Sequence, residues 1–510
     1  MRGYPFLMLC AFLLFLSFYQ LGSPTLFDVD EAVFAEATKE MVESGDWITP
    51  TYNGVNRYDK PIFFYWLMAA SYKVFGVGEF GARFPSAFLG LMLCCAVYFF
   101  VKYLKGETNA LYAAAALGLS VFFVVYSHAA VTDMALTLFM TLSLFSFYIS
   151  LKKSGFIYGF YVFSALAFLT KGLIGIVFPF GIASMYLVAT EGVKGIKKVF
   201  SLKGTVLFCL ISVPWYVAQT AVNGSEFIQQ FFLKHHFMRY TGVISGHKGP
   251  VYYYVLVLLA GLFPWIVFLP AGIRSVFKEK DDLNLFALIW FGTIVLFFSF
   301  STTKLPNYIL PAIPAASVVI AAGMSDPDGR WKKYAHICIA VVSLSIAFAL
   351  LMSLKGYLFN FRVYDTDWIF IAAAIMFSLA MLCVYVAFTE KSFYVLMSCT
   401  MFLFLLVLSL RALPIANRHL QGTLHQYSIY AGRVLQGDDR IIAYGLNNPS
   451  IVFYSGHKVL NTKNKNELLP YMAAGNGRIA IVKAKDIDAL KSMNYYLLES
   501  DGTYALLERK

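Results

Sequence analysis

The residues best suited to chemistry lie in a polar segment near the start of the chain, between two long apolar stretches. Asp28, Asp30 and Glu31 place three carboxylates within four positions, and an acid–lysine–proline run follows at 59–61. Ionisable groups beside a membrane are costly and usually belong to a functional site. A carboxylate there can orient or deprotonate a nucleophile, and a lysine can hold an anion. We therefore interpret this segment as the floor of an active site.

The composition surrounding this segment is that of a membrane protein. Of the 510 residues, 59% are hydrophobic and only 14% are charged, against roughly 25% charged in soluble domains. The mean hydropathy is +0.66. The net charge of +12 does not indicate binding to nucleic acid, because the basic residues form short clusters between apolar runs. Such clusters act as topology signals and face anionic lipid.

The elements that must position the polar segment are apolar helices. We count about thirteen runs of the length that crosses a bilayer, which predicts a polytopic α-helical membrane protein. They lie near 4–22, 83–104, 108–127, 133–151, 156–170, 172–190, 204–221, 251–273, 284–301, 307–323, 335–354, 367–388 and 393–411. The first has no small-residue cleavage site and reads as an uncleaved helix. The fifth and sixth are separated only by Thr170-Lys171-Gly172, so this pair decides whether the count is odd or even.

Charge bias predicts the side that each loop faces. With the N-terminus inside, lysine-rich turns such as 194–203 face the cytoplasm, as the positive-inside rule expects. The same register places the loop 23–82, the loop 222–250, Lys304 and the C-terminal tail outside. The polar segment therefore belongs to the outer face.

The composition changes after Arg411, which predicts two domains. We expect a transmembrane domain at 1–411, with the outer loop 23–82, and a small α/β domain at 412–510. In the tail, β-like runs lie at 440–444, 478–483 and near 495–498, and helical patterns lie near 449–454 and 466–473. The tail has no glycine-rich phosphate loop and no catalytic cluster, so a structural cap or lid is its simplest role.

Residues 30–43 repeat apolar side chains at helical spacing and predict an amphipathic helix on the membrane surface. Asp28 and Asp30 lie at its start, where unpaired N–H groups and the helix dipole stabilise a carboxylate. Asp30 is therefore open to a second interpretation as a helix cap. A single cap does not require Asp28 and Glu31 beside it, which favours a site.

Short motifs follow one another along the chain in a fixed order. They are Asp30-Glu31, Ser44-Gly45-Asp46-Trp47, Asp59-Lys60-Pro61, Tyr65-Trp66, Thr170-Lys171-Gly172, His236 with Arg239, Pro250 to Tyr254, Phe263-Pro264-Trp265, Lys304 to Tyr308, Asn448-Pro449-Ser450 and Phe453-Tyr454. Together they resemble the GT-C glycosyltransferases related to protein O-mannosyltransferases. The resemblance is strongest to the bacterial aminoarabinose transferases of lipid A.

The resemblance implies the GT-C fold and an inverting transfer of a sugar from a polyprenyl (undecaprenyl) phosphate carrier. The acceptor would be lipid A or another envelope glycolipid at the periplasmic face of the bacterial inner membrane. The implied partners are the lipid-linked donor, a lipid or glycan acceptor and membrane lipids, with no nucleic acid. The sequence does not indicate an oligomeric state.

The resemblance also assigns roles to individual residues. Asp30 would be the base, and Glu31 and Asp133 would be further catalytic residues. The donor phosphate and substrate contacts would be Lys60, Lys171, Arg239, Lys304, Tyr308, Asp59 and His236.

The sequence leaves simpler alternatives open for several of these residues. Lys171 can snorkel between two short helices, and Asp133 can cap a helix. His236 can pack at the membrane interface. Tyr308 can belong to an aromatic belt, and Lys304 can be a plain anchor.

The sequence does not firmly predict a cofactor. Asp59 and His236 match positions that can approach a metal in relatives, but two ligands far apart in sequence are not a metal motif. The cysteines lie within apolar runs without ligand spacing, so we expect no structural disulfide. A divalent metal stays an open alternative.

Two departures from the aminoarabinose transferases leave the substrates undecided. Val33 stands where those enzymes carry arginine, and Asp59 stands where they carry glutamate. Lys60 in place of histidine favours the lipid-modifying branch. Transfer to protein hydroxyls or to polysaccharide by the same fold remains an alternative. A transporter is the alternative from another class, but the chain has no repeated halves and its charges gather on the outer side.

Overall fold

The computed structural model describes residues 4–231, 249–279, 281–326, 329–354, 367–389, 394–473, 477–491 and 493–509. Contacts divide the chain into two compact units. The membrane unit comprises Met1–Tyr19, Asp59–Phe64 and Ser86–Ala412. The loop–tail unit comprises Gln20–Tyr58, Tyr65–Pro85 and Leu413–Lys510. Most of the predicted active-site loop therefore groups with the C-terminal tail rather than with the apolar helices.

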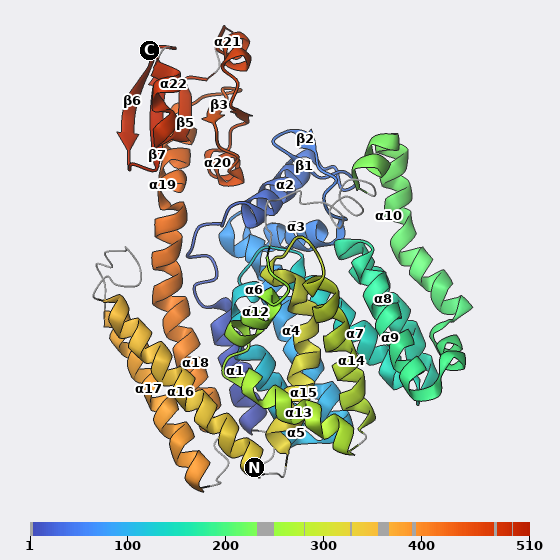
Figure 1. Ribbon diagram of the computed structural model, residues 1–510. Helices are drawn as coiled ribbons and strands as arrows, with labels where there is room; N and C mark the ends of the chain where they lie inside the picture. The colour runs from blue at the N-terminus through green and yellow to red at the C-terminus, as the bar shows by residue number, and fades with distance from the viewer. Residues whose placement is uncertain are drawn as a thin grey trace. The chain divides into compact units, whose positions relative to one another are not determined.

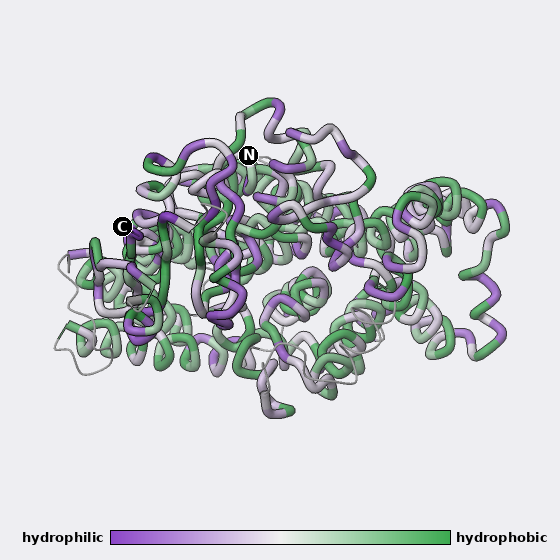
Figure 2. The backbone as a smooth tube through the Cα atoms, turned by 90° about the horizontal axis from the view of Figure 1, so that it is seen from above, coloured by the Kyte–Doolittle hydropathy of each residue, from purple (hydrophilic) through white to green (hydrophobic). Residues whose placement is uncertain are grey.

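Figure 1 labels the helices that carry residues of the membrane unit, and most of the helical tube in Figure 2 has the green of hydrophobic residues. These helices are α1 (Tyr4–Phe18), α4 (Glu79–Lys105), α5 (Glu107–Gly118), α6 (Val121–Ser127), α7 (Asp133–Ser150), α8 (Ile157–Lys171), α9 (Ile174–Glu191), α10 (Leu202–Ile228), α12 (Tyr253–Gly261), α13 (Leu269–Glu279), α14 (Asp282–Ser299), α15 (Ile313–Ser325), α16 (Gly329–Ser353), α17 (Asp367–Thr389) and α18 (Tyr394–Val407). Short helical turns include η4 (Trp265–Phe268) and η5 (Pro306–Ala312).

These helices make the chain a multi-pass membrane protein. Over the described ranges, nine helices are long and apolar enough to cross a membrane, or up to eleven if each bent pair is one span. The shorter helices α1 and α8 have 15 residues each. The number of thirteen spans therefore stays a prediction.

Two of the expected spans are sharply bent. The run predicted at 108–127 forms α5 and α6, which meet at 60°, because the Ser120 side chain accepts a hydrogen bond from Phe123 N and starts a new helix. The run predicted at 251–273 breaks after α12 by 110°. Pro264 lies at this break, where its missing N–H cannot continue the helical ladder.

Hydrogen bonds made by polar side chains connect the helices that carry candidate site residues. Ser143 of α7 bonds Phe160 O and Ser164 Oγ of α8, at 2.9 and 2.8 Å. Trp290 of α14 donates to Pro311 O of η5 at 2.9 Å. Direct hydrogen bonds therefore hold α7 to α8, and α14 to η5.

The loop–tail unit begins with α2 (Asp30–Ser44), a hairpin of β1 (Thr51–Tyr52) and β2 (Val55–Asn56), and α3 (Phe63–Phe75), which starts in the membrane unit. The tail contributes α19 (Leu413–Val434), α20 (Pro449–Ser455), α21 (Lys465–Ala473), α22 (Ile487–Lys491) and five strands. The strands are β3 (Ile441–Tyr444), β4 (Val459–Thr462), β5 (Ile479–Lys483), β6 (Tyr495–Ser500) and β7 (Tyr504–Arg509).

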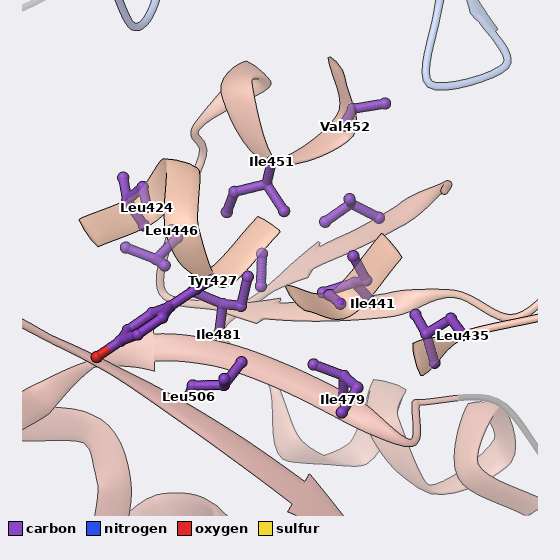
Figure 3. Packing of buried hydrophobic residues seen from close by; sticks show 13 residues of the cluster. Leu424, Tyr427, Leu435, Ile441, Leu446, Ile451, Val452, Ile479, Ile481 and Leu506 are labelled. Atoms are coloured by element: carbon purple, nitrogen blue, oxygen red, sulfur yellow. The ribbon is translucent and has the colours of Figure 1, made fainter. Parts of the chain in front are cut away.

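The five strands form one mixed sheet in the order β4-β3-β5-β7-β6. β3 pairs in parallel with β4 and β5, whereas β7 pairs antiparallel with β5 and β6. The predicted α/β character of the tail is confirmed, although β4 and β7 were not expected. Both faces of the sheet are covered, so the tail has a hydrophobic core of its own. On one face, α19 and α20 contribute Leu424, Tyr427 and Ile451, which pack against Ile441, Ile481 and Leu506 (Figure 3).

Candidate active site

The three carboxylates at the start of α2 have three different environments. Asp28 accepts hydrogen bonds from Asn448 Nδ2 at 3.0 Å, Ser450 N at 2.8 Å and Ser450 Oγ at 2.5 Å. Burial raises the pKa of Asp28, although these hydrogen bonds oppose the rise. Asp28 is therefore committed to the tail, near the first turn of α20.

Glu31 is paired with a buried arginine that the sequence analysis did not single out. Arg83 Nε and Nη2 donate to Glu31 Oε1 and Oε2 at 2.9 and 2.8 Å, a bidentate geometry. Glu31 is 4% exposed and Arg83 is 2% exposed. Phe27 N also donates to Glu31 at 2.9 Å. Glu31 therefore holds the backbone that precedes Asp30.

The remaining guanidinium donors of Arg83 bind the chain just before the carboxylates. They donate to Leu21 O at 3.1 Å, Pro24 O at 2.6 Å and Thr25 O at 3.0 Å. An arginine at the edge of a predicted span is unusual enough to have been a signal.

Asp30 differs from both neighbours. It is the first residue of α2 and is exposed. Within the described residues its carboxylate has no hydrogen-bond or ion-pair partner. The residue that caps α2 is Val29, without a side-chain cap bond, so Asp30 does not serve as the helix cap. The positive end of α2 favours a carboxylate at this position. Of the three acids, Asp30 is the one available to a substrate.

A second cluster lies within the membrane unit and joins distant parts of the sequence. Lys171, the last residue of α8, contacts Asp133 Oδ1, at the start of α7, over 2.6 Å. Asn307 Nδ2 donates to the same oxygen at 3.1 Å. The ammonium lies 5.9 Å from the centroid of the Tyr308 ring. The side chains of Lys171 and Asp133 are only 11% and 4% exposed, which makes this a buried ion pair.

These contacts decide two of the open alternatives. Asp133 does not cap α7, because the capping residue is Thr132, and Lys171 binds an acid rather than extending to the membrane surface. Asn307 was not singled out from the sequence, although it lies inside the 304–308 motif.

Lys304 has a different environment from the one expected of a phosphate ligand. Its Nζ donates to Ser299 O at 2.7 Å, Ser301 O at 2.9 Å and Phe298 O at 3.3 Å. It is 4% exposed and closes the carbonyl end of α14. With its three N–H groups directed at these carbonyls, Lys304 holds the turn that leads into η5.

The other predicted residues give less information. Lys60 is half-buried and donates to Asp59 O at 3.2 Å, and both belong to the membrane unit. His236 and Arg239 lie outside the described residues. Where the chain is described, no group of three or more His, Cys, Asp or Glu residues could hold a metal ion.

Comparison with known proteins identifies the family. The sequence profile of the family described as dolichyl-phosphate-mannose-protein mannosyltransferase matches residues 59–217. An uncharacterized protein of Aquifex aeolicus is 32% identical over 353 residues, which cover 67% of this chain and 70% of the relative. ArnT from Cupriavidus metallidurans, solved bound to undecaprenyl phosphate, superposes with a TM-score of 0.84 over 99% of this chain and 98% of that chain, at 23% identity. The chain belongs to the GT-C glycosyltransferases.

Relatives with a named function lie in the same family. The undecaprenyl phosphate-alpha-4-amino-4-deoxy-L-arabinose arabinosyl transferase of Yersinia pestis is 29% identical over 362 residues. The match covers 68% of this chain and 65% of that enzyme. The predicted family, fold class and enzyme class are confirmed by these comparisons.

Proposed function

We propose that this glycosyltransferase moves a sugar from undecaprenyl phosphate to lipid A or a related envelope glycolipid. The observation that carries the proposal is the 29% identity, over 362 residues, to the Yersinia arabinosyl transferase. We further propose that Asp30, the loop–tail unit and the acceptor lie at the periplasmic face of the inner membrane. The positive-inside pattern of the lysine-rich turns supports this orientation.

The proposed reaction is a single displacement with inversion. An oxygen of the acceptor attacks the anomeric carbon of the sugar, and the bond from that carbon to the phosphate oxygen breaks. Undecaprenyl phosphate leaves with the bonding electrons, and the proton of the acceptor passes to the Asp30 carboxylate. The exposure of Asp30 and the lack of a partner among the described residues support this role.

Cations must take up the charge of the departing phosphate. We assign this role to Lys171 and Lys60, with Arg239 and His236 retained from the sequence analysis. In this assignment Asn307 holds the Asp133 carboxylate, and Asp133 holds the Lys171 ammonium beside the Tyr308 ring. A phosphate oxygen would then share the ammonium with Asp133. Asp59 stays a substrate contact, whereas Lys304 acts by holding the turn before η5.

Purified protein tests this proposal directly. Full-length chain in proteoliposomes is supplied with undecaprenyl-phosphate-linked aminoarabinose and lipid A, and the products are followed by mass spectrometry. The wild type is expected to add the sugar, and Asp30→Asn is expected to lower kcat by about 10²–10⁴-fold, the usual contribution of a general base. Glu43→Gln, an exposed acid on the same helix, is the matched control. Full turnover by Asp30→Asn would remove Asp30 from the mechanism.

The family match at residues 59–217 favours one second candidate, transfer to hydroxyl groups of proteins. Transfer to polysaccharide by the same fold is retained from the sequence analysis. Mass spectra of lipid A, glycoproteins and polysaccharide separate the candidate acceptors. They are compared between cells that carry the wild type and cells that carry the Asp30→Asn variant. A mass change confined to glycoproteins or polysaccharide would show that they, and not lipid A, accept the sugar.

A further inference from the structure

The C-terminal tail makes a series of directional contacts with the backbone just before Asp30. Asn417 of α19 accepts from Thr25 N and Thr25 Oγ1 at 3.0 and 2.9 Å, and donates back to Thr25 O at 2.8 Å. The Tyr454 hydroxyl accepts from Leu26 N at 2.7 Å and donates to Glu79 at 2.9 Å. All of these residues belong to the loop–tail unit.

Asp28 is the strongest of these connections. Its two oxygens take three hydrogen bonds from Asn448 and Ser450, including one from the backbone N–H of Ser450. Hydrogen bonds to a charged acceptor are roughly twice as strong as neutral ones. Ser450 is 2% exposed, so water does not readily replace its side chain. The sequence separation of Asp28 and Ser450 is 422 residues, so this contact joins the tail to the active-site loop.

The contacts from the tail and from Arg83 restrain the same short stretch. Arg83 binds the carbonyls of Leu21, Pro24 and Thr25, together with Glu31. Asp28 is fixed by the tail. Between these restraints the Asp30 side chain remains exposed. A base has to be held within a fraction of an ångström of its working position, since a misplacement of about 1 Å can cost about 100-fold in rate.

We propose that Asp28 is a positioning residue, and that the tail, through Asn448, Ser450 and Tyr454, holds the Asp30 base in its working geometry. This inference rests on the proposed function of Asp30. It assigns the tail a part in catalysis beyond that of a cap or lid. The hydrophobic core of the tail packs on both faces of its sheet, so the fold of the tail does not depend on the Asp28 contact.

Steady-state kinetics of the full chain in proteoliposomes test the proposal. Asp28→Ala and Ser450→Ala are expected to lower kcat about 10- to 100-fold, with the KM of the lipid-linked donor changed less than about twofold. Asp28→Asn keeps an acceptor for Ser450 N and gains a donor for Ser450 Oγ. With the Asn448 amide turned so that its oxygen faces the new amide, this variant is expected to retain kcat within about threefold of the wild type. The double variant Asp28→Ala/Ser450→Ala is expected to lose no more than Asp28→Ala alone, because the two residues act through one contact.

The matched control removes a side-chain hydrogen bond elsewhere in the tail. Thr423 Oγ1 donates to Asp501 at 2.6 Å in an exposed position, and Thr423→Val is expected to leave kcat unchanged. Unchanged kcat in Asp28→Ala and Ser450→Ala would overturn the proposal. So would a loss in Asp28→Asn as large as that in Asp28→Ala, since that would point to the charge rather than the contact.

Hydrogen exchange of the same variants gives a readout that does not depend on turnover. The amides of Leu26 and Phe27 are bonded to Tyr454 and Glu31, and the amide of Ala32 to Phe27 O at 3.4 Å. Asp28→Ala and Ser450→Ala are expected to speed exchange at these amides at least about tenfold, and Thr423→Val is not. Exchange equal to the wild type would overturn the proposal even if no sugar transfer were found. If the wild type showed no sugar transfer but the variants showed the expected faster exchange, only the proposed function would be overturned.

Discussion

The buried pair of Glu31 and Arg83 provides the sharpest test of how the active-site loop is held. Arg83→Met removes the two bonds to Glu31 and the three to the carbonyls of Leu21, Pro24 and Thr25. The methionine keeps an apolar stem of similar length but supplies no donor. We expect this single change to loosen the backbone before Asp30 and to destabilise the whole loop–tail unit.

The magnitude follows from the burial of the pair. Glu31 is 4% exposed, so Arg83→Met leaves a buried carboxylate without its arginine counter-charge. Removing one partner of such a pair costs about 3–5 kcal/mol. The carbonyls of Leu21 and Pro24 lose their Arg83 donors, which costs about 1–3 kcal/mol more for each unless water reaches it, whereas Thr25 O keeps its bond from Asn417. A total above about 5 kcal/mol is comparable with the whole stability of many domains.

The double variant Glu31→Met/Arg83→Met separates the charge from the packing. It removes both ions, and replacing a buried ion pair by apolar side chains often leaves the free energy of unfolding unchanged or raises it. We therefore expect it to recover about 3 kcal/mol relative to Arg83→Met while still lowering kcat, because the carbonyls of Leu21 and Pro24 have lost their Arg83 donors.

Thermal unfolding of the detergent-purified variants, followed by tryptophan fluorescence, measures the stabilities on one scale. Arg418→Met removes an exposed arginine of the same unit and is the control. The reasoning fails if Arg83→Met melts with the wild type, or if the double variant is as unstable as Arg83→Met.

Two further changes test the membrane cluster and the buried acid of α2. Lys171→Met is expected to weaken binding of undecaprenyl phosphate about tenfold, which corresponds to about 1.4 kcal/mol. Lys152→Met, which changes an exposed lysine, should leave the affinity unchanged. Equal affinities of the two variants in a direct binding titration would contradict the role of Lys171 as a phosphate contact. Burial raises the pKa of Glu36 from 4.5 to about 7, so the folded state holds this proton more tightly than the unfolded chain. Stability should fall by on the order of 3 kcal/mol as the pH rises from about 4.5 to about 7. Glu36→Gln should abolish that fall in melting curves recorded between pH 5 and 8, and parallel curves for both proteins would refute it.

The sequence singled out candidate site residues because their types stand out in an apolar chain. Asp30, Asp133 and Lys171 were all singled out, and the last two meet in the structure. The sequence could not assign separate tasks to Asp28 and Glu31. Their partners are Ser450 and Arg83, at sequence separations of 422 and 52 residues, and no local pattern reports such contacts.

The apolar runs predicted the helices but not their bends. A run of hydrophobic residues reports the length of a span, whereas a bend depends on a few backbone hydrogen bonds. Ser120 and Pro264, at the two bends, were visible in the sequence, but serines and prolines also occur inside helices that continue, such as α4 with Pro85. Whether such a residue breaks the helix is decided by packing around it.

Val33 is a position next to the candidate site that supports the backbone and carries no reactive group. The resemblance to aminoarabinose transferases implies an arginine at this position in those enzymes, three positions after the proposed base. Val33 is 5% exposed and donates from its backbone to Val29 O at 3.3 Å. It therefore stabilises the first turn of α2 and offers no charge to a substrate. Any cation that meets a substrate beside Asp30 must therefore come from a position other than 33.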